Sequence, residues 1–310
     1  MKIGYFADGP WSHKAIERIL DNDEFEIVFI VPRYETRDRV LKQWAEKLNV
    51  PFIVASDVNS PDFIEQVKAF EADIFVSMSF NQILKEAIIS VPPRGFINCH
   101  AGALPFYRGR NPLNWALING EERFGITVHY IDEGIDTGDI IEQAFFQIGP
   151  HDNYGSLLEV AIEGCAEVLI KALLGIKSNK VKALKQSDIH PVGTYFGMRR
   201  VGDEYLEFCW GAQRLHNFVR ALATPGPEAR FFVGEIEYAL VKTSLIAGAP
   251  NYIATEGEVV GRTHEGVVVK VGDSTLAMNL IREVSQGSVP TDAFIPRFAI
   301  GTRLQGRNNR

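Results

Sequence analysis

The first half of the chain alternates short apolar runs with amphipathic stretches, and this alternation limits the possible folds more than any other feature of the sequence. Runs of strand length lie at residues 3–6, 26–31, 52–54 and 74–77, separated by helical patterns at 11–20, 38–48 and 62–70. Strands that alternate with helices along a chain usually pair in parallel, and the helices then cover the sheet. The sequence therefore predicts an α/β domain with a mostly parallel sheet.

The rest of the chain predicts a second, smaller domain. A strand pattern at 140–148 and a long amphipathic helix at 154–174 complete the first domain, which is expected to cover residues 1–200. Residues 201–310 contain one short helical pattern, at 212–222, and strand patterns at 231–233, 236–241, 258–260 and 266–271. Several short strands separated by turn residues are typical of a small β-barrel. With 310 residues, of which 46% are hydrophobic, the chain can form two such cores.

Polar residues cluster where the apolar run at residues 95–97 ends. Asn98 and His100 are two apart in an extended segment, so they project to the same face. Open parallel sheets bind their ligands at the carboxyl ends of strands, which makes this pair a candidate site. Taken singly, His100 also reads as a hydrogen-bonded structural histidine and Asn98 as a turn residue.

A second polar segment follows the strand pattern at residues 125–131. Asp136 lies in this acidic loop, which is punctuated by glycines and leads into the strand pattern at 140–148. Asp-Gly combinations also make ordinary turns, so the loop alone does not identify a site. It lacks the spacing of an EF-hand, which excludes that type of calcium site.

Composition excludes several function classes. The net charge is −7, and residues 201–310 carry eleven Lys and Arg against twelve Asp and Glu, which argues against a nucleic-acid partner. No apolar run reaches the length of about 18 residues that a membrane span needs. The apolar stretch at residues 1–7 is too short for the hydrophobic region of a signal sequence, so we expect a cytoplasmic protein. Cys99, Cys165 and Cys209 are widely separated, which predicts reduced thiols and no metal site.

The two polar segments together resemble a known family. Between Asn98 and Ile141 the chain contains Asn-x-His, Leu-Pro-x-x-Arg-Gly and Asp-x-Gly-x-Asp-x-Gly. In order and spacing these motifs resemble the 10-formyltetrahydrofolate-dependent formyltransferases, which include methionyl-tRNA, glycinamide ribonucleotide and sugar-nucleotide formyltransferases. The resemblance implies a Rossmann-like catalytic domain, an OB-like C-terminal barrel and N10-formyltetrahydrofolate as co-substrate. It also assigns Asn98, His100 and Asp136 as the catalytic residues.

The same resemblance implies the contacts to the folate. By motif position they are Gln82, Ile83, Leu84, Arg110, Asp132, Glu133, Gly134 and Ile135. An alternative for residues 82–84 is the start of a core helix. Arg108 and Arg110 have a second possible role, because a guanidinium is well shaped for paired hydrogen bonds to the phosphate of an acceptor.

The acceptor is indicated by the residues that follow Tyr107. The sequence Arg-Gly-Arg-Asn-Pro-Leu-Asn-Trp at residues 108–115 resembles the sugar-nucleotide branch, whereas the tRNA enzymes usually have Arg-Gly-Ala-Ala-Pro there. The leading hypothesis is a sugar-nucleotide N-formyltransferase that acts on the amine of a nucleotide-linked amino-deoxy sugar, for a surface polysaccharide. The alternatives are a methionyl-tRNA formyltransferase and a non-catalytic folate-binding or assembly module. The barrel is expected to serve in homodimer formation or simply in support.

Overall fold

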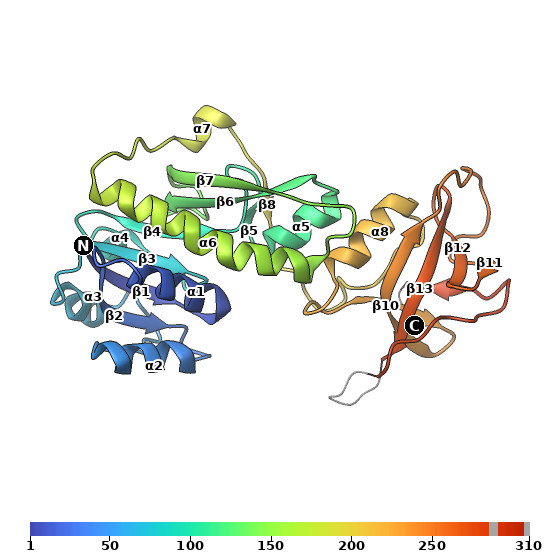
Figure 1. Cartoon of the computed structure of the whole chain (residues 1–310), viewed down its shortest axis with the longest axis horizontal. Helices are drawn as coiled ribbons and strands as arrows, with labels where there is room; N and C mark the ends of the chain where they lie inside the picture. The colour runs from blue at the N-terminus through green and yellow to red at the C-terminus, as the bar shows by residue number, and fades with distance from the viewer. Residues whose placement is uncertain (285–290, 307–310) are drawn as a thin grey trace. The chain divides into compact units, whose positions relative to one another are not determined.

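The computed structural model describes residues 1–284 and 291–306, which form two compact units (Figure 1). The first unit comprises Met1–Pro112, Arg123–Gln147 and Leu158–Gly197. The second comprises Leu113–Glu122, Ile148–Leu157 and Met198–Arg310. Two short segments from the first half of the chain thus group with the C-terminal residues. The boundary at residue 200 stays a prediction.

The first unit is built on a six-stranded sheet. Its strands are β1 (Lys2–Ala7), β2 (Glu26–Pro32), β3 (Ile74–Met78), β4 (Phe96–His100), β6 (Arg123–Tyr130) and β7 (Ile140–Gln147), in the order β2-β1-β3-β4-β6-β7. The first four strands pair in parallel, and β6 and β7 are antiparallel to their neighbours. The predicted strand at 52–54 is wrong, because the only strand pairing there is a single bridge between Phe52 and Ile30.

Helices and one further strand pair complete this unit. They are α1 (Gly9–Leu20), α2 (Arg39–Leu48), α3 (Pro61–Lys68), α4 (Glu86–Ile89), α6 (Tyr154–Lys177, from Leu158 onward), α7 (Gln186–Ile189) and the pair β5 (Arg108–Gly109) and β8 (Tyr195–Phe196). Side-chain hydrogen bonds explain two of the helix starts. The Asp38 carboxylate accepts from the N–H groups of Val40 and Leu41 at the start of α2, and Ser60 Oγ accepts from Phe63 N at the start of α3. These bonds satisfy donors that a helix leaves without an internal partner.

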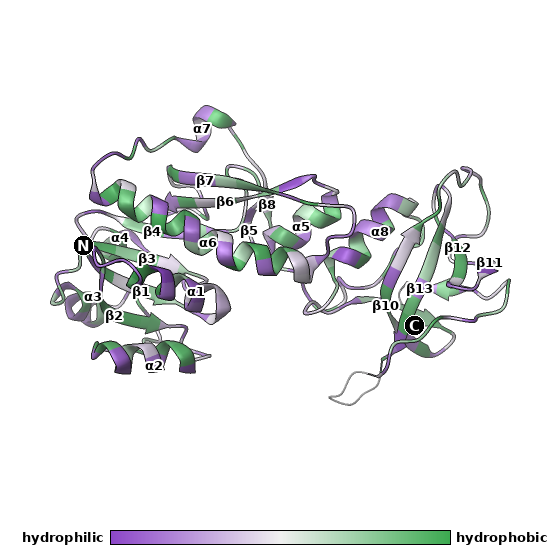
Figure 2. Ribbon diagram, viewed as in Figure 1, coloured by the Kyte–Doolittle hydropathy of each residue, from purple (hydrophilic) through white to green (hydrophobic). Residues whose placement is uncertain are grey.

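The two faces of the sheet are covered differently. On one face the rings of Phe6, Phe29, Phe75 and Phe96 pack together with Phe63 of α3. On the other face, Tyr5 Oη donates to the carbonyl of Ser12 on α1, and Cys99 Sγ lies 3.6 Å from the carbonyl of Cys165 on α6. Figure 2 shows the apolar character of β1 and β2 and the mixed surface of α2. Since side chains alternate along a strand, Asn98 and His100 share the face of Phe96 and point away from α6.

The second unit is an antiparallel sheet curled into a half-barrel. Its elements are α5 (Pro112–Asn119), α8 (Ala212–Ala221), β9 (Ala229–Val233), β10 (Ile236–Leu245), β11 (Val259–Thr263), β12 (Gly266–Lys270), β13 (Thr275–Glu283) and β14 (Leu304–Gln305). The strand order is β11-β12-β13-β10-β9-β14. Leu304 pairs with Val233 on β9, and its N–H also donates to the carbonyl of Gly257 (2.8 Å), just before β11, so the two ends of the sheet approach each other. The predicted fold class, an α/β domain with a parallel-rich sheet followed by a small β-barrel, is confirmed.

Candidate active site

Strands β4 and β6 bring two histidines and an asparagine onto one face of the first sheet. Asn98 pairs with His129 across the two strands, and His100 pairs with Thr127. Directly opposed residues share a face of the sheet, so the Asn98 and His129 side chains meet, with Nδ2 of the amide 3.3 Å from Nε2 of the ring. His129 Nδ1 lies 2.7 Å from the carbonyl of Tyr130, which can only accept, so this nitrogen carries a proton. In neutral His129, Nε2 is then an acceptor for the Asn98 amide.

Asp136 completes this group from the loop between β6 and β7. Its carboxylate oxygens lie 3.8 Å from His100 Nδ1 and 3.6 Å from His129 Nε2, and one of them accepts from the backbone N–H of Gly109 at 2.8 Å. The backbone of Asp136 is left-handed, with φ at +54°. The structure therefore brings together Asn98, His100 and Asp136, the three residues predicted to be catalytic. Their catalytic role remains a proposal.

The Asp136 carboxyl is held in its ionised form. Burial by itself would raise its pKa, because it disfavours the charge. The His100 and His129 rings in their protonated forms, together with the hydrogen bond from the Gly109 N–H, oppose burial and lower the pKa far below its ordinary value. Asp136 is consequently an anion at any pH at which an enzyme of this kind works.

His100 is oriented through its second nitrogen. Nε2 lies 2.7 Å from the carbonyl of Tyr107, so it carries a proton and donates it there, while Nδ1 faces Asp136. The chain can turn back onto the ring only because residue 102 is glycine. A Cβ at Gly102 would lie 2.5 Å from His100 Nε2 and 2.7 Å from the Tyr107 carbonyl, both closer than van der Waals contact permits.

A network of hydrogen bonds holds the segment from Tyr107 to Arg110. Strand β8 pairs with β5, and the N–H groups of Arg108 and Arg110 donate to the carbonyls of Thr194 and Phe196. The Arg108 guanidinium donates to Gln186 Oε1 at 2.9 and 2.7 Å and to the carbonyl of Val192 at 3.2 Å. Arg108 is thus engaged within the protein, whereas Arg110 is exposed. Of the two arginines in the motif, Arg110 is the one available to a ligand.

The remaining residues predicted to contact folate lie in two loops. Gln82, Ile83 and Leu84 follow β3. The Gln82 amide bridges Val58 N and the carbonyl of Ala55, Leu84 is buried in the phenylalanine-rich core, and Ile83 is 73% exposed. Only Ile83 of these three therefore presents an uncommitted side chain.

The acidic loop that carries Asp136 is more open. Asp132 Oδ1 accepts from Gly134 N and Thr137 Oγ1, which shapes the turn, and Glu133, Gly134 and Ile135 are exposed. The exposed residues are available to a ligand, and their contact with folate stays a prediction.

Two residues of this network were not singled out by the sequence analysis. His129 is 2% exposed on a strand of otherwise mostly apolar residues, a polar exception that is visible in the sequence. Gln186 gave no such signal, because it lies in a lysine-rich connection that reads as solvated surface.

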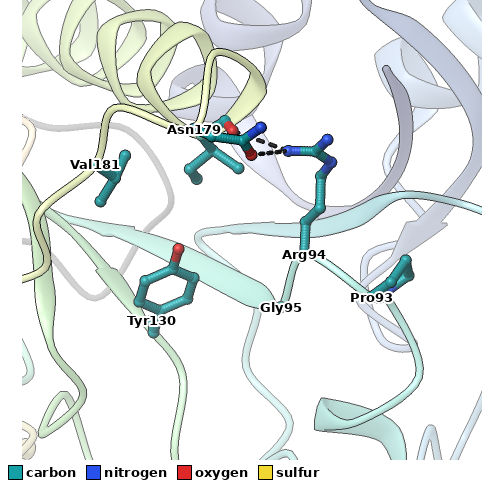
Figure 3. Close-up of a pocket in the computed structure, with 7 residues that line it drawn as sticks. Pro93, Arg94, Gly95, Tyr130, Asn179 and Val181 are labelled. Atoms are coloured by element: carbon teal, nitrogen blue, oxygen red, sulfur yellow. Dashed lines mark hydrogen bonds between the residues drawn. The ribbon is translucent and has the colours of Figure 1, made fainter.

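A separate pocket of about 460 Å³ lies beside the start of β4 and the end of β6 (Figure 3). It is lined by Pro93, Arg94, Gly95, Tyr130, Ile176, Asn179 and Val181. Arg94 donates to the carbonyl of Ile176 and to Asn179 Oδ1, so its guanidinium interacts with the C-terminal end of α6. Tyr130 is opposed to Ile97, whose side chain points away from Asn98. The Tyr130 side chain therefore lies on the other face of the sheet from Asn98, and Tyr130 also contacts the candidate site through its carbonyl, which accepts from His129.

Two general features bear on the possible functions. Within residues 1–284 and 291–306, no group of three or more His, Cys, Asp or Glu side chains is arranged to hold a metal ion. Across the same described residues, no helix combines the length and the apolar character needed to cross a membrane.

Comparison with known proteins gives the family. The formyl transferase model matches residues 2–173, and the model of the formyl transferase C-terminal domain matches residues 200–298. Curated relatives include methionyl-tRNA formyltransferases of Citrifermentans bemidjiense, 30% identical over 310 residues (97% of this chain, 94% of the relative), and of Thermotoga maritima, 31% identical over 282 residues (86% and 88%).

Solved structures with a similar fold include two sugar enzymes. WlaRD, a sugar 3N-formyl transferase solved with dTDP and 5-N-formyl-THF, has a TM-score of 0.68 and 23% identity over 93% of this chain and 99% of its own. The N-formyltransferase of Helicobacter canadensis, in complex with folinic acid and dTDP-3-aminofucose, has a TM-score of 0.67 and 21% identity, over 90% and 99%. Because the family model covers more than half of the sequence, the chain belongs to the formyl transferase family and is an enzyme of folate-dependent formyl transfer.

Proposed function

We propose that this enzyme transfers the formyl group of N10-formyltetrahydrofolate to the amine of a nucleotide-linked amino sugar. The observation that carries the chemistry is the cluster of Asn98, His100 and Asp136 on one face of the sheet, with His100 Nδ1 3.8 Å from the Asp136 carboxylate. The proposal for the acceptor rests on the Arg-Gly-Arg motif, of which Arg110 is exposed, and on the nucleotide and amino-sugar ligands of structures with the same fold.

The residue types suit the tetrahedral intermediate of this reaction. The acceptor amine attacks the formyl carbon, and negative charge develops on the formyl oxygen. The Asn98 amide and the His100 ring N–H are donors for this oxyanion, and a single donor of this kind can contribute about 2.7–4 kcal/mol. His129 would hold the Asn98 amide in place, because its proton on Nδ1 leaves Nε2 as an acceptor.

Proton transfer follows from the position of Asp136. When the intermediate collapses, the folate nitrogen leaves and needs a proton, which His100 would supply through the N–H that points to the Tyr107 carbonyl in this structure. Before this step the His100 ring is protonated on both nitrogens, and Asp136 stabilises its positive charge. A water molecule held by Asp136 would accept the proton lost by the attacking amine.

The second candidate is a methionyl-tRNA formyltransferase. The observation in its favour is that curated relatives at 29–31% identity, matched over most of their length, carry this name. Against it stand the acidic net charge of −7 and the Arg-Gly-Arg motif in place of Arg-Gly-Ala. The chemistry at Asn98, His100 and Asp136 would be the same for either acceptor.

Single alanine variants test the catalytic roles. Asn98→Ala, His100→Ala and Asp136→Ala should remain folded, bind 5-formyltetrahydrofolate, and lose on the order of 10²-fold or more in kcat. Turnover within about 2-fold of the wild type in any of the three would rule out the role proposed for that residue.

Arg110→Gln distinguishes between the two possible partners of the exposed guanidinium. A raised KM for the sugar nucleotide alone would assign Arg110 to the acceptor phosphates, and a raised KM for the folate alone would assign it to the co-substrate. The matched control is Arg39→Gln, an exposed arginine on α2.

A further inference from the structure

Gln186 uses its whole hydrogen-bonding capacity inside the protein. This side chain is 3% exposed, although α7 is a single short turn whose other residues are exposed. Oε1 accepts both bonds from the Arg108 guanidinium, at 2.9 and 2.7 Å, and Nε2 donates to the backbone carbonyls of Asp136 and Gly138, each at 2.8 Å. A primary amide has two donor hydrogens and two acceptor lone pairs, so all four are satisfied.

These bonds close a ring around the carboxylate of Asp136. Gln186 donates to the carbonyl of Asp136, and the Asp136 carboxylate accepts from Gly109 N. Arg108, the residue before Gly109, donates to Gln186 Oε1 and so completes the ring. Each link is a direct contact of 2.9 Å or less. The ring therefore fixes both the backbone that carries the carboxylate and the N–H that orients it.

The Asp136 backbone needs such an anchor. Its φ of +54° lies in the left-handed region, which costs a non-glycine residue conformational energy unless its surroundings hold it. The four residues that precede it are exposed, and Gln186 binds the loop at Asp136 itself and on its C-terminal side, at Gly138.

We propose that Gln186 is a positioning residue for formyl transfer, which holds the Asp136 carboxylate at its distance from His100 through the carbonyls of Asp136 and Gly138. This inference rests on the proposed function of Asp136. Gln186 does not touch the reacting atoms, and it acts only through Asp136 and Arg108. Glutamate is nearly the same size and keeps an acceptor for Arg108, but it loses the two donors to the loop and places a negative charge beside the two carbonyls. The Gln186→Glu variant therefore breaks the part of the network that the proposal invokes.

The first test is a double-mutant cycle in kcat. With N10-formyltetrahydrofolate and dTDP-3-aminofucose as probe acceptor, Gln186→Glu should lower kcat on the order of 10- to 100-fold, while KM for the folate changes little. In the Asp136→Asn background the same substitution should change kcat less than about 2-fold, because the carboxylate that it positions is already absent. The control is Asp188→Asn, an exposed residue of the same turn, which should leave kcat unchanged.

The second test needs no acceptor. The effect of Asp136→Asn on the urea midpoint of unfolding is measured twice, in the wild-type and in the Gln186→Leu background. If Gln186 positions the Asp136 carboxylate, this carboxylate stabilises the fold less once Gln186 is removed. A smaller effect of Asp136→Asn in the Gln186→Leu background is expected. Equal effects in both backgrounds, or a kcat loss from Gln186→Glu that persists in Asp136→Asn, would overturn the inference.

The two tests separate the inference from the proposed function. If the wild-type protein formylates none of a panel of nucleotide-linked amino sugars, the proposed function fails, and the urea cycle still decides whether Gln186 positions Asp136. If the wild type turns over the sugar but the cycle in kcat is additive, Gln186 supports the fold alone and the positioning role is wrong.

Discussion

Among single residues, Asp136 concentrates most of the electrostatic interactions of the site. Two histidine rings and one backbone N–H face its carboxylate, and together they outweigh the effect of burial on its pKa. Because the folded-state pKa is depressed, the ionised carboxylate stabilises the fold. This contribution is fully present above the ordinary value of 3.8 and is lost as the pH falls through the folded-state pKa.

The first prediction concerns acid stability. Asp136→Asn removes the ionised group, so at about pH 7 the variant should have a lower free energy of unfolding than the wild type. The difference should shrink as the pH falls below about 4, measured by urea unfolding at a series of pH values. A difference that grows on acidification would mean that the carboxyl is not held in its ionised form.

The second prediction concerns Gly102. A methyl group there would lie 2.5 Å from His100 Nε2, so Gly102→Ala should displace the ring and reduce kcat on the order of 10²-fold. Gly197→Ala is the matched control, because a Cβ at Gly197 meets nothing within 4 Å. Both variants are assayed for turnover and thermal unfolding. Normal turnover of Gly102→Ala would show that His100 tolerates the displacement.

At the scale of secondary-structure elements, the alternating pattern predicted the parallel strands β1, β2 and β3 of the first sheet well. The runs that became β1, β2 and β3 are mostly apolar and mostly buried, which is why they could be recognised as strands from the sequence. The pattern at residues 52–54 failed because three apolar residues make only one bridge to Ile30. Pairs as short as β5 and β8 leave no periodic signal, since they depend on contacts between residues 108–109 and 195–196 that are distant in the chain.

The candidate site was predictable only where its residues stand in motifs. Asn98, His100 and Asp136 lie in motifs of characteristic spacing, so all three could be predicted as site residues from the sequence. The ring through Gln186 was not predictable, because its four bonds join the side chain to Arg108 and to carbonyls about 50 residues away. Backbone carbonyls carry no sequence identity, and their partners become visible only in the folded chain.

The third prediction concerns the helix starts. Asp38 caps α2 and also accepts from Gly9 N at the start of α1 and from His13, whereas Ser60 only caps α3. Removing a cap typically costs about 1 kcal/mol. Asp38→Ala should therefore destabilise the protein by roughly 2 kcal/mol or more and Ser60→Ala by about 1 kcal/mol, measured by urea unfolding. Equal losses would mean that the bonds from Asp38 to α1 contribute little.

The contact of Asp38 with Gly9 also bears on ligand binding. In dinucleotide-binding folds the start of the first helix receives a pyrophosphate. Here the Asp38 carboxylate accepts from the first N–H of α1 at 2.8 Å, so a side chain of the protein supplies the anion. This agrees with the absence of the Gly-x-Gly-x-x-Gly fingerprint from the sequence.

For the whole molecule, the two candidate acceptors differ in how strongly salt should weaken their binding. A protein that binds an RNA backbone through several phosphates loses affinity steeply as salt rises, by about 10³–10⁵ between 50 and 200 mM for six to ten contacts. A sugar nucleotide carries only two phosphates. The fourth prediction is that kcat/KM for the acceptor falls by less than about 10-fold over this range of salt. A fall of several orders of magnitude would indicate a polynucleotide acceptor despite the charge of −7.

The most direct test of the proposed function is formyl transfer by the purified wild-type protein. N10-formyltetrahydrofolate is supplied with a panel of nucleotide-linked amino sugars that includes dTDP-3-aminofucose, beside initiator tRNA with and without methionine, and His100→Ala serves as the inactive control. We expect transfer to one amino sugar, none to either tRNA, and none by the control. Transfer to methionine-charged tRNA alone would contradict the proposed acceptor and leave the roles of Asn98, His100 and Asp136 in place.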